Sequence, residues 1–199
     1  MLPLRACSSG HFWVFGYGSL MWNPGFTPAE VRPGLLLGYH RRFCLYSTQY
    51  RGTDERPGLV LGLDRGGSCR GLALRIPLQQ QEAVSRALWE REMLNDEYHP
   101  RILPVRTAAG PVPCLTFVVD RRNRFYSGRL APAETASIIA GARGDRGPCA
   151  EYLDNTVRHL DQLGLEDRSL TRLREEVQRL LRVPPARPAA NEAARPPAS

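Results

Sequence analysis

The order of its local patterns is the feature that most constrains the fold of this chain, because strand-like segments come first and helical segments last. The expected strands are joined by short turns rich in glycine and proline, which allow neighbours to pair as antiparallel hairpins. A doubly wound parallel sheet would need strands that alternate with helices. The order therefore predicts an α+β fold with a mixed, largely antiparallel, small barrel-like β-sheet and flanking helices.

The expected elements follow from hydrophobic periodicity and turn residues. We expect strands over residues 12–15, 35–47, 58–64, 71–76, 102–107 and 113–120, and helices over 79–95, 132–142, 148–163 and 167–182. Gly38 predicts a bulge, and Asp64-Arg-Gly-Gly-Ser68 predicts a turn that joins two strands as a hairpin. Asp167 is the expected N-cap of the last helix, since its side chain can accept bonds from the first backbone N–H groups.

The length of 199 residues suits one domain large enough to bury a core. We expect an N-terminal arm over residues 1–11, a single domain over 12–182, and a tail over 183–199. The tail is rich in proline and alanine and has nothing to bury, which predicts disorder. No apolar run reaches the roughly 18 residues that a membrane-spanning helix needs.

The charge balance leaves two interpretations open. The formal net charge is +7, and all 27 basic residues are arginine. An arginine-rich surface could bind a nucleic acid or an acidic partner, since guanidinium groups bind phosphate well. The alternative is a compositional bias of the coding sequence. No run of five or six like charges occurs, so a basic tail is not indicated, and small anionic substrates remain compatible with the charge.

Cysteine and histidine patterns argue against a disulfide framework and a metal site. The five cysteines are widely spaced, odd in number and never form Cys-x-x-Cys, and the four histidines form no His-Glu-x-x-His pattern. Residues 1–10 lack the apolar core of a signal peptide. These patterns predict a protein of a reducing, cytoplasmic compartment.

The segment Phe15-Gly-Tyr-Gly-Ser-Leu-Met-Trp22 follows the first expected strand. Its two glycines would let the backbone approach a ligand closely, and successive N–H groups can converge on an anion. It lacks the third glycine of a dinucleotide fingerprint, the lysine of a phosphate loop and the flanking glycines of a nucleophile elbow. From the residues alone, a ligand-binding loop and an ordinary strand-ending turn both remain open.

Two further features carry candidate chemistry. Val84, Leu88 and Glu92 recur at helical spacing, so Glu92 shares the apolar face of its helix. Burial would raise the pKa of its carboxyl, which suits general acid/base catalysis, whereas an exposed glutamate paired with an arginine is the structural alternative. Alternation along a strand sends Arg41 and Arg42 to opposite faces, so that one could enter a pocket and bind an anion.

A set of short motifs occurs in a fixed order over residues 12–181. They are Val14-Phe-Gly-Tyr-Gly-Ser-Leu20, Arg41-Arg-Phe43, Ser47-Thr48 with Arg51-Gly52, Pro57-Gly58, Arg91-Glu92-Met93 and Glu151-Tyr152-Leu153. In this combination the chain resembles the ChaC-like γ-glutamylcyclotransferases. The segment from Met93 to Tyr98 replaces the Gly-Gly-Tyr of some relatives and is similar to that of the bacterial members.

The resemblance implies cyclisation of the γ-glutamyl group of glutathione to 5-oxoproline, with release of cysteinylglycine and without a metal or organic cofactor. It assigns Glu92 as the general acid/base. It implies substrate contacts from Gly16, Tyr17, Gly18, Ser19, Leu20, Met21, Arg42, Ser47, Arg51 and Tyr152. Glutathione is then the expected partner, and neither nucleic acid nor a membrane is. The same cyclisation of other γ-glutamyl amines or dipeptides is an alternative, and an arginine-rich binding module is a second.

Overall fold

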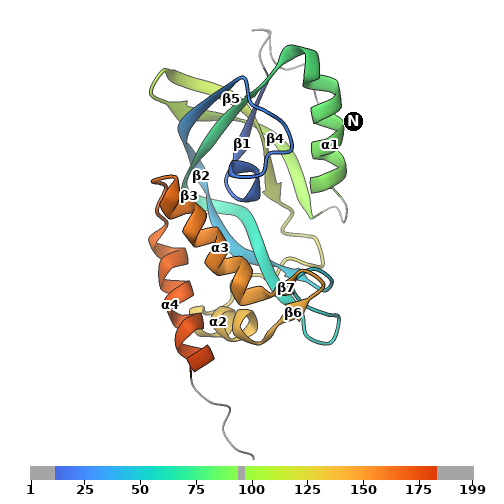
Figure 1. The fold of residues 1–199 in the computed structure, drawn as a ribbon, viewed down its shortest axis with the longest axis vertical. Coiled ribbons are helices and arrows are strands. Elements are labelled where there is room, and N and C mark those ends of the chain that lie inside the picture. Colours follow the sequence, from blue (N-terminus) through green and yellow to red (C-terminus); the bar gives the residue numbers. More distant parts are fainter. Residues whose placement is uncertain (1–11, 94–96, 183–199) are drawn as a thin grey trace, which may run out of the picture.

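Five strands close into a barrel in the computed structural model of this chain, in the order β1-β3-β2-β4-β5 (Figure 1). The structure describes residues 12–93 and 97–182; the expected N-terminal arm and tail therefore lie outside the described residues. The barrel strands are β1 (Phe12–Gly16), β2 (Glu30–Ser47), β3 (Gly58–Ile76), β4 (Tyr98–Thr107) and β5 (Gly110–Val119). The α+β barrel expected from the sequence is confirmed.

Most of the barrel is antiparallel, and one parallel seam closes it. β1 pairs with β3 and β3 with β2, while β4 pairs with both β2 and β5, all antiparallel. β1 then runs parallel to β5, with Trp13 opposite Cys114 and Val14 opposite Leu115. The sheet is therefore mixed but largely antiparallel, as the short turns predicted.

The hairpin expected around Asp64-Arg-Gly-Gly-Ser68 is wrong, because β3 is a single strand of 19 residues. Gly66 and Gly67 take positive φ values of 106° and 65°, but the chain continues in the same direction. Opposite them, Gly38 has a φ of 82° at a shift in the β2–β3 register, which confirms the predicted bulge. Both strands are irregular at the same level, so they continue together and no turn forms.

The helices follow the sequence closely. α1 is Gln81–Glu92, α2 is Pro132–Gly141, α3 is Cys149–Gln162 and α4 is Arg168–Arg182. Short elements complete the fold: the 3-10 turns η2 (Ser19–Met21) and η3 (Leu78–Gln80) and the two-residue strands β6 (Arg143–Gly144) and β7 (Gly147–Pro148). The Asp167 side chain accepts bonds from the backbone N–H groups of Ser169 and Leu170 at 3.1 and 3.3 Å, which confirms it as the N-cap of α4.

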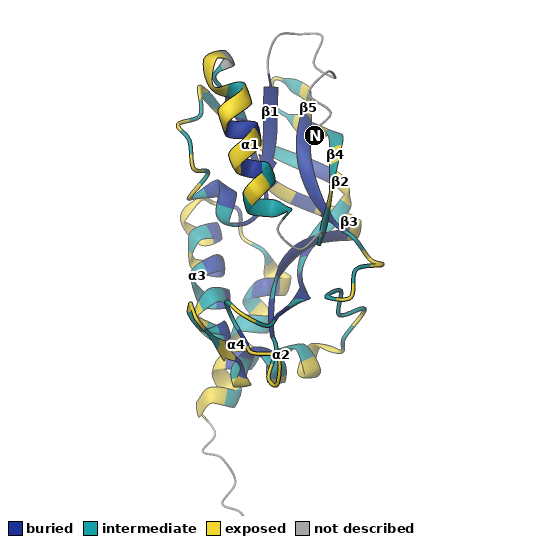
Figure 2. Ribbon diagram, turned by 90° about the vertical axis from the view of Figure 1, so that its right-hand side faces the viewer, coloured by how far each residue is buried: buried dark blue, intermediate teal, exposed yellow. Residues whose placement is uncertain are grey.

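The helices cover opposite ends of the molecule. α1 lies beside β1 at one end, while α2, α3 and α4 pack together against the other end of the long β2–β3 ribbon (Figure 1). β1, β3 and β5 are buried along most of their length, whereas β4 and the first part of β2 are largely accessible, and the outer helix faces are exposed (Figure 2). No helix within residues 12–93 and 97–182 is long and apolar enough to cross a membrane.

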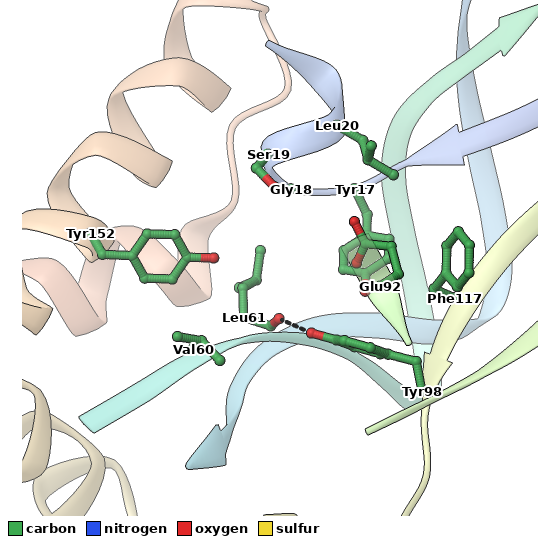
Figure 3. A pocket seen from close by; sticks show the side chains of 10 residues that line it. All are labelled: Tyr17, Gly18, Ser19, Leu20, Val60, Leu61, Glu92, Tyr98, Phe117 and Tyr152. Carbon is green, nitrogen blue, oxygen red and sulfur yellow. Dashed lines mark hydrogen bonds between the residues drawn. The ribbon is translucent and has the colours of Figure 1, made fainter. Parts of the chain in front are cut away.

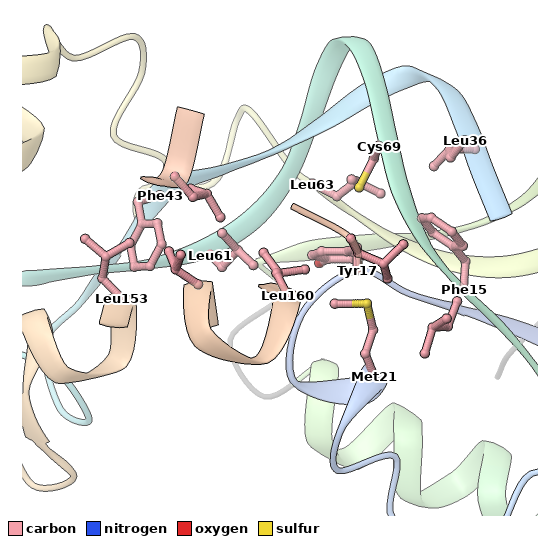
Figure 4. Packing of buried hydrophobic residues seen from close by; sticks show 14 of the residues in the cluster. Phe15, Tyr17, Met21, Leu36, Phe43, Leu61, Leu63, Cys69, Leu153 and Leu160 are labelled. Carbon is pink, nitrogen blue, oxygen red and sulfur yellow. The ribbon is translucent and has the colours of Figure 1, made fainter. Parts of the chain in front are cut away.

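One apolar cluster joins the barrel interior to the helical layer. Phe15 and Leu63 from the barrel strands, and Leu153 and Leu160 from α3, all belong to it and are almost fully buried (Figure 4). A second cluster packs Val84 and Leu88 of α1 against β1 and β5. Because both clusters end at the segment after β1, this segment is held between the two helical regions.

Candidate active site

A cavity of about 80 Å³ opens where the segment after β1 meets the end of α1 (Figure 3). Its lining is mostly apolar and aromatic, with one carboxylate. The lining residues are Tyr17, Gly18, Ser19, Leu20, Val60, Leu61, Glu92, Tyr98, Phe117 and Tyr152.

The loop of the Gly-Tyr-Gly-Ser segment is shaped by close packing. After β1 the chain turns into η2, where the Met21 N–H donates to the Gly18 carbonyl at 2.9 Å. A Cβ at Gly18 would lie 3.2 Å from the Leu61 side chain, and a Cβ at Gly71 of β3 would lie 2.3 Å from the Gly16 carbonyl oxygen. Glycine at these positions therefore lets the loop lie directly against β3.

Glu92 is the last residue of α1, and its side chain is 16% exposed. Leu88 and Val84, one and two turns earlier, are buried on the same face, as their spacing predicted. Burial raises the pKa of the Glu92 carboxyl, and the charge of Glu97 raises it further, while the Arg91 guanidinium opposes both. A raised pKa brings the carboxyl closer to the pH at which it can both accept and return a proton.

Three tyrosines, Tyr17, Tyr98 and Tyr152, line the cavity together with this carboxylate. Tyr98 donates to the Leu61 carbonyl at 3.2 Å, and the hydroxyl of Tyr152 points into the cavity from α3 (Figure 3). Burial raises the pKa of Tyr152 to about 12 and that of Tyr17 and Tyr98 well above the ordinary value. All three hydroxyls therefore stay protonated. The proton of Tyr98 is engaged by the Leu61 carbonyl, whereas the hydroxyl of Tyr152 can serve as a neutral hydrogen-bond donor toward the cavity.

Arg91 connects the helix to the loop. Its Nε lies 3.2 Å from Glu92 Oε1, its Nη2 donates to Ser19 Oγ at 2.7 Å, and its Nη1 donates to the Asn23 carbonyl at 2.8 Å. One guanidinium thus contacts both the Glu92 carboxylate and the loop after β1 and helps to fix their relative positions.

A larger cleft of about 940 Å³ continues from the cavity, sharing Ser19, Val60, Glu92, Tyr98 and Tyr152 with it. Its outer walls carry the segment from Tyr46 to Arg51 and one side of α3. Trp22 stacks on His159 across a centroid distance of 4.4 Å at this wall. Glu92 therefore lines both the cavity and the larger cleft.

Arg51 forms part of the cleft wall and also supports it. Its Nη1 donates to the carbonyls of Arg146 and Pro148 at 2.6 and 3.2 Å, and its guanidinium lies over the Tyr152 ring at 5.2 Å. Its backbone N–H donates to Ser47 Oγ at 3.1 Å. Arg51 therefore fixes the position of the α3 tyrosine beside the cavity.

The structure brings most of the expected site residues together. Tyr17, Gly18, Ser19, Leu20, Glu92 and Tyr152 line the cavity, and Ser47 and Arg51 line the cleft outside it. Gly16 ends β1 directly before the loop, and the Met21 side chain is buried in the apolar cluster beneath it.

Arg42 lies elsewhere. Its guanidinium pairs with Asp64 at 3.2 Å and also donates to the Gly128 carbonyl, and it lines neither the cavity nor the cleft. Its neighbour Arg41, on the opposite face as alternation predicted, is 4% exposed and lies 3.9 Å from Asp167.

Four cavity residues were not singled out from the sequence: Val60, Leu61, Tyr98 and Phe117. Val60, Leu61 and Phe117 fall in expected strands, where they are indistinguishable from other core positions. Tyr98 lies in the segment after the helix that carries Glu92, where no local pattern distinguishes it as a cavity residue. No group of three or more metal-ligating side chains occurs in the described part of the chain.

A family model described as ChaC-like protein matches residues 12–180, which is nearly all of the part that the structure describes. The chain belongs to the ChaC-like family. A glutathione-specific γ-glutamylcyclotransferase of Escherichia coli is 39% identical over 173 residues, covering 86% of this chain and 75% of the relative. Its namesake in Schizosaccharomyces pombe is 32% identical over 183 residues, covering 81% of this chain and 88% of the relative.

Solved structures agree with the barrel of this ChaC-like chain. The crystal structure of a yeast γ-glutamyl cyclotransferase specific to glutathione superimposes with a TM-score of 0.76 at 23% identity, covering 85% of this chain and 96% of that one. At this identity the likeness concerns the fold.

Proposed function

We propose that this ChaC-like chain is a glutathione-specific γ-glutamylcyclotransferase that forms 5-oxoproline and cysteinylglycine, with Glu92 as the general acid/base. The observation that carries the proposal is the single carboxylate of the cavity, whose pKa is raised by burial and which faces the loop after β1. The names of the bacterial and yeast relatives support the choice of glutathione.

The reaction closes a five-membered ring within the substrate. The Glu92 carboxylate takes a proton from the α-amine of the γ-glutamyl group, and the amine nitrogen forms a bond to the γ-carbonyl carbon. The amide bond to cysteine then breaks, and Glu92 returns the proton to the departing amine. No oxidant, reductant or further reactant is needed, because the bonds formed and broken balance within one molecule.

The cavity would contribute mainly by orientation and by hydrogen bonds. The γ-glutamyl chain must fold back on itself, and orientation of this kind lowers barriers by roughly 7–11 kcal/mol in favourable cases. In this proposal the neutral hydroxyl of Tyr152 and the backbone N–H groups of the loop at Gly18 and Ser19, all of which line the cavity, donate to the oxyanion that develops at the γ-carbonyl. The peptide part of the substrate would extend into the larger cleft past Ser47 and Arg51.

A cytoplasmic location is part of this proposal, as is a small-molecule substrate without nucleic-acid or membrane partners. It is supported by the four described cysteines, Cys44, Cys69, Cys114 and Cys149, which are all buried free thiols. Buried thiols without disulfides are typical of a reducing compartment.

The test is a substrate panel with the purified protein. We expect 5-oxoproline, measured by mass spectrometry, from glutathione at a higher kcat/KM than from γ-glutamyl dipeptides or γ-glutamyl amines. Glu92→Gln should remove the activity, whereas Glu90→Gln, on the exposed side of the same helix, should keep it. Product from none of these compounds would overturn the cyclisation, and a preference for another γ-glutamyl compound would overturn glutathione specificity.

The pH dependence gives a second readout. Because burial raises the pKa of Glu92 and only the ionised carboxylate accepts a proton, kcat/KM should fall on acidification at a pH above the ordinary glutamate pKa of about 4.3. A profile that stays flat down to that pH would exclude Glu92 as the base.

A further inference from the structure

Arg91 is the only arginine that contacts both the Glu92 carboxylate and the loop after β1 among the residues that the structure describes. Each of its three nitrogens has a different partner: Nε faces Glu92, Nη1 faces the Asn23 carbonyl and Nη2 faces Ser19. Its side chain is 33% exposed, so these contacts are partly shielded from water. The guanidinium spreads its donors over three nitrogens in a rigid planar fork and so reaches three separated partners, whereas the three donors of an ammonium group all lie on one nitrogen.

The bond to Ser19 determines what that hydroxyl can do. Ser19 Oγ accepts a charge-assisted bond from Arg91 at 2.7 Å, so the hydroxyl proton must point elsewhere. Ser19 itself lines both the cavity and the larger cleft. Its hydroxyl is therefore set as a donor toward whatever occupies the cavity.

We propose that Arg91 is a positioning residue that couples the Glu92 carboxylate to the loop after β1 and orients the Ser19 hydroxyl as a hydrogen-bond donor to the γ-glutamyl group. This inference rests on the proposed cyclisation, because it assigns the geometry through which Glu92 and Ser19 act on one substrate. Arg91 touches no reacting atom in this scheme and acts through its two neighbours.

The charges around Glu92 make the coupling measurable. Glu92 is faced by Arg91 on its own helix, by Glu97 in the segment before β4, and by the hydroxyls of Tyr17, Tyr98 and Tyr152. Arg91 is the one cation in this set and lowers the pKa of Glu92, whereas burial and Glu97 raise it. Removal of its charge should therefore move the acidic limb of kcat/KM to higher pH.

The experiment compares Arg91→Met with Arg91→Lys and with Arg86→Met. Arg86 lies on the same helix and, among the described residues, pairs with the exposed Glu82 alone at 3.2 Å, so it is a matched control. Arg91→Met should lower kcat/KM for glutathione by roughly 10- to 100-fold, as expected for lost bonds to a charged group, and should raise KM. Arg91→Lys should keep the acidic limb near its wild-type position but recover only part of the lost kcat/KM, because it keeps the charge and loses the fork.

Ser19→Ala tests the second half of the coupling. If Arg91 acts through the Ser19 hydroxyl, the double variant Ser19→Ala with Arg91→Met should lose less than the product of the two single losses. Multiplicative losses would overturn the orientation of Ser19 by Arg91.

Two readouts do not depend on turnover and keep this inference separate from the proposed function. An NMR titration should show a higher pKa for Glu92 in Arg91→Met than in the wild type or Arg86→Met. Amide hydrogen exchange over residues 16–23 should be faster in the same variant. Unchanged values in both would overturn the coupling even if glutathione is turned over, whereas a wild type that turns over no γ-glutamyl compound would overturn the cyclisation.

Discussion

Asp64 on β3 and Glu92 at the end of α1 are both withdrawn from water, yet their surroundings act on them in opposite directions. The Asp64 side chain is 1% exposed and accepts bonds from Arg121 at 2.7 Å, Tyr126 at 3.0 Å and the Arg65 N–H at 2.8 Å. Burial alone would raise the pKa of Asp64, but these bonds outweigh it and the pKa is lowered. Glu92 has one cation, Arg91, and its pKa is raised.

The comparison shows that burial alone does not set the direction of a carboxyl pKa shift. The hydrogen-bond donors and cations around the carboxylate determine whether the shift is upward or downward. Asp64 ties β3 to Arg42 on β2 and to the segment after β5, and it stays ionised. Fewer charged donors face Glu92, so burial prevails and its pKa is raised, which makes proton exchange easier than at Asp64. One acid therefore stabilises the barrel and the other is suited to chemistry.

The largest expected effect comes from Glu92→Gln. General acid/base groups contribute roughly 10²- to 10⁴-fold to rate, so kcat for 5-oxoproline formation should fall by that factor. The melting temperature should not fall, since a neutral amide is easier to bury than a carboxylate. If Glu92→Gln kept the wild-type kcat, Glu92 would not be the general acid/base and would not differ from Asp64 in its function.

Asp64→Asn should act on stability instead. Breaking a buried ion pair leaves its cations without a counterion and costs about 3–5 kcal/mol of unfolding free energy, which urea denaturation would measure. The kcat of the folded protein should stay close to that of the wild type. Glu82→Gln, in an exposed pair, is the control and should change the unfolding free energy by less than about 1 kcal/mol.

Arg42→Met tests whether a residue predicted to bind substrate belongs to the surroundings of Asp64 or to the substrate site. Arg42 bonds to Asp64 and lines neither the cavity nor the cleft, so its loss should cost about 1.5–3 kcal/mol of stability and leave the KM for glutathione unchanged. Arg51→Met, in the cleft wall beside Tyr152, should raise KM. A raised KM in Arg42→Met would place it in substrate binding after all.

The smallest expected effect is on how the free energy of unfolding depends on pH, where Glu92 and Asp64 should act with opposite signs. The lowered pKa of Asp64 gives stability that is complete above the unfolded aspartate pKa and is lost as pH falls through the folded value. The raised pKa of Glu92 has the reverse consequence: its ionised form costs stability above the folded pKa, and the cost disappears on acidification. Relative to the wild type, Glu92→Gln should thus be more stable at neutral pH and Asp64→Asn less stable. Both differences should shrink as pH falls, and equal signs in urea titrations would contradict this.

Sequence patterns were informative where local chemistry determines the structure. The period of Val84 and Leu88 placed Glu92 on a buried face, and the residues after β1 indicated a close approach of the backbone. The turn expected at Gly66 and Gly67 failed because positive φ values also occur at bulges, and only the partner strand decides between the two.

The rest of the site depends on contacts between segments that are far apart along the chain. The bond from Arg91 to Ser19 spans 72 positions, and Tyr98 meets the Leu61 carbonyl across 37. No local pattern encodes such pairs, since each requires the barrel to be closed first. Arg42 illustrates the converse, because its strand position allowed a pocket and its long-range partner Asp64 directs it elsewhere.

The parallel pairing of β1 with β5 has a consequence for the folding of the chain. Residue 13 must find residue 114 before the barrel is complete, and such distant pairings form slowly because a long loop of chain must be closed. The cavity takes Tyr17 from just beyond β1 and Phe117 from β5, on the two sides of that seam. The cavity is therefore complete only when this seam is closed, so the active site depends on the most distant strand pairing of the barrel.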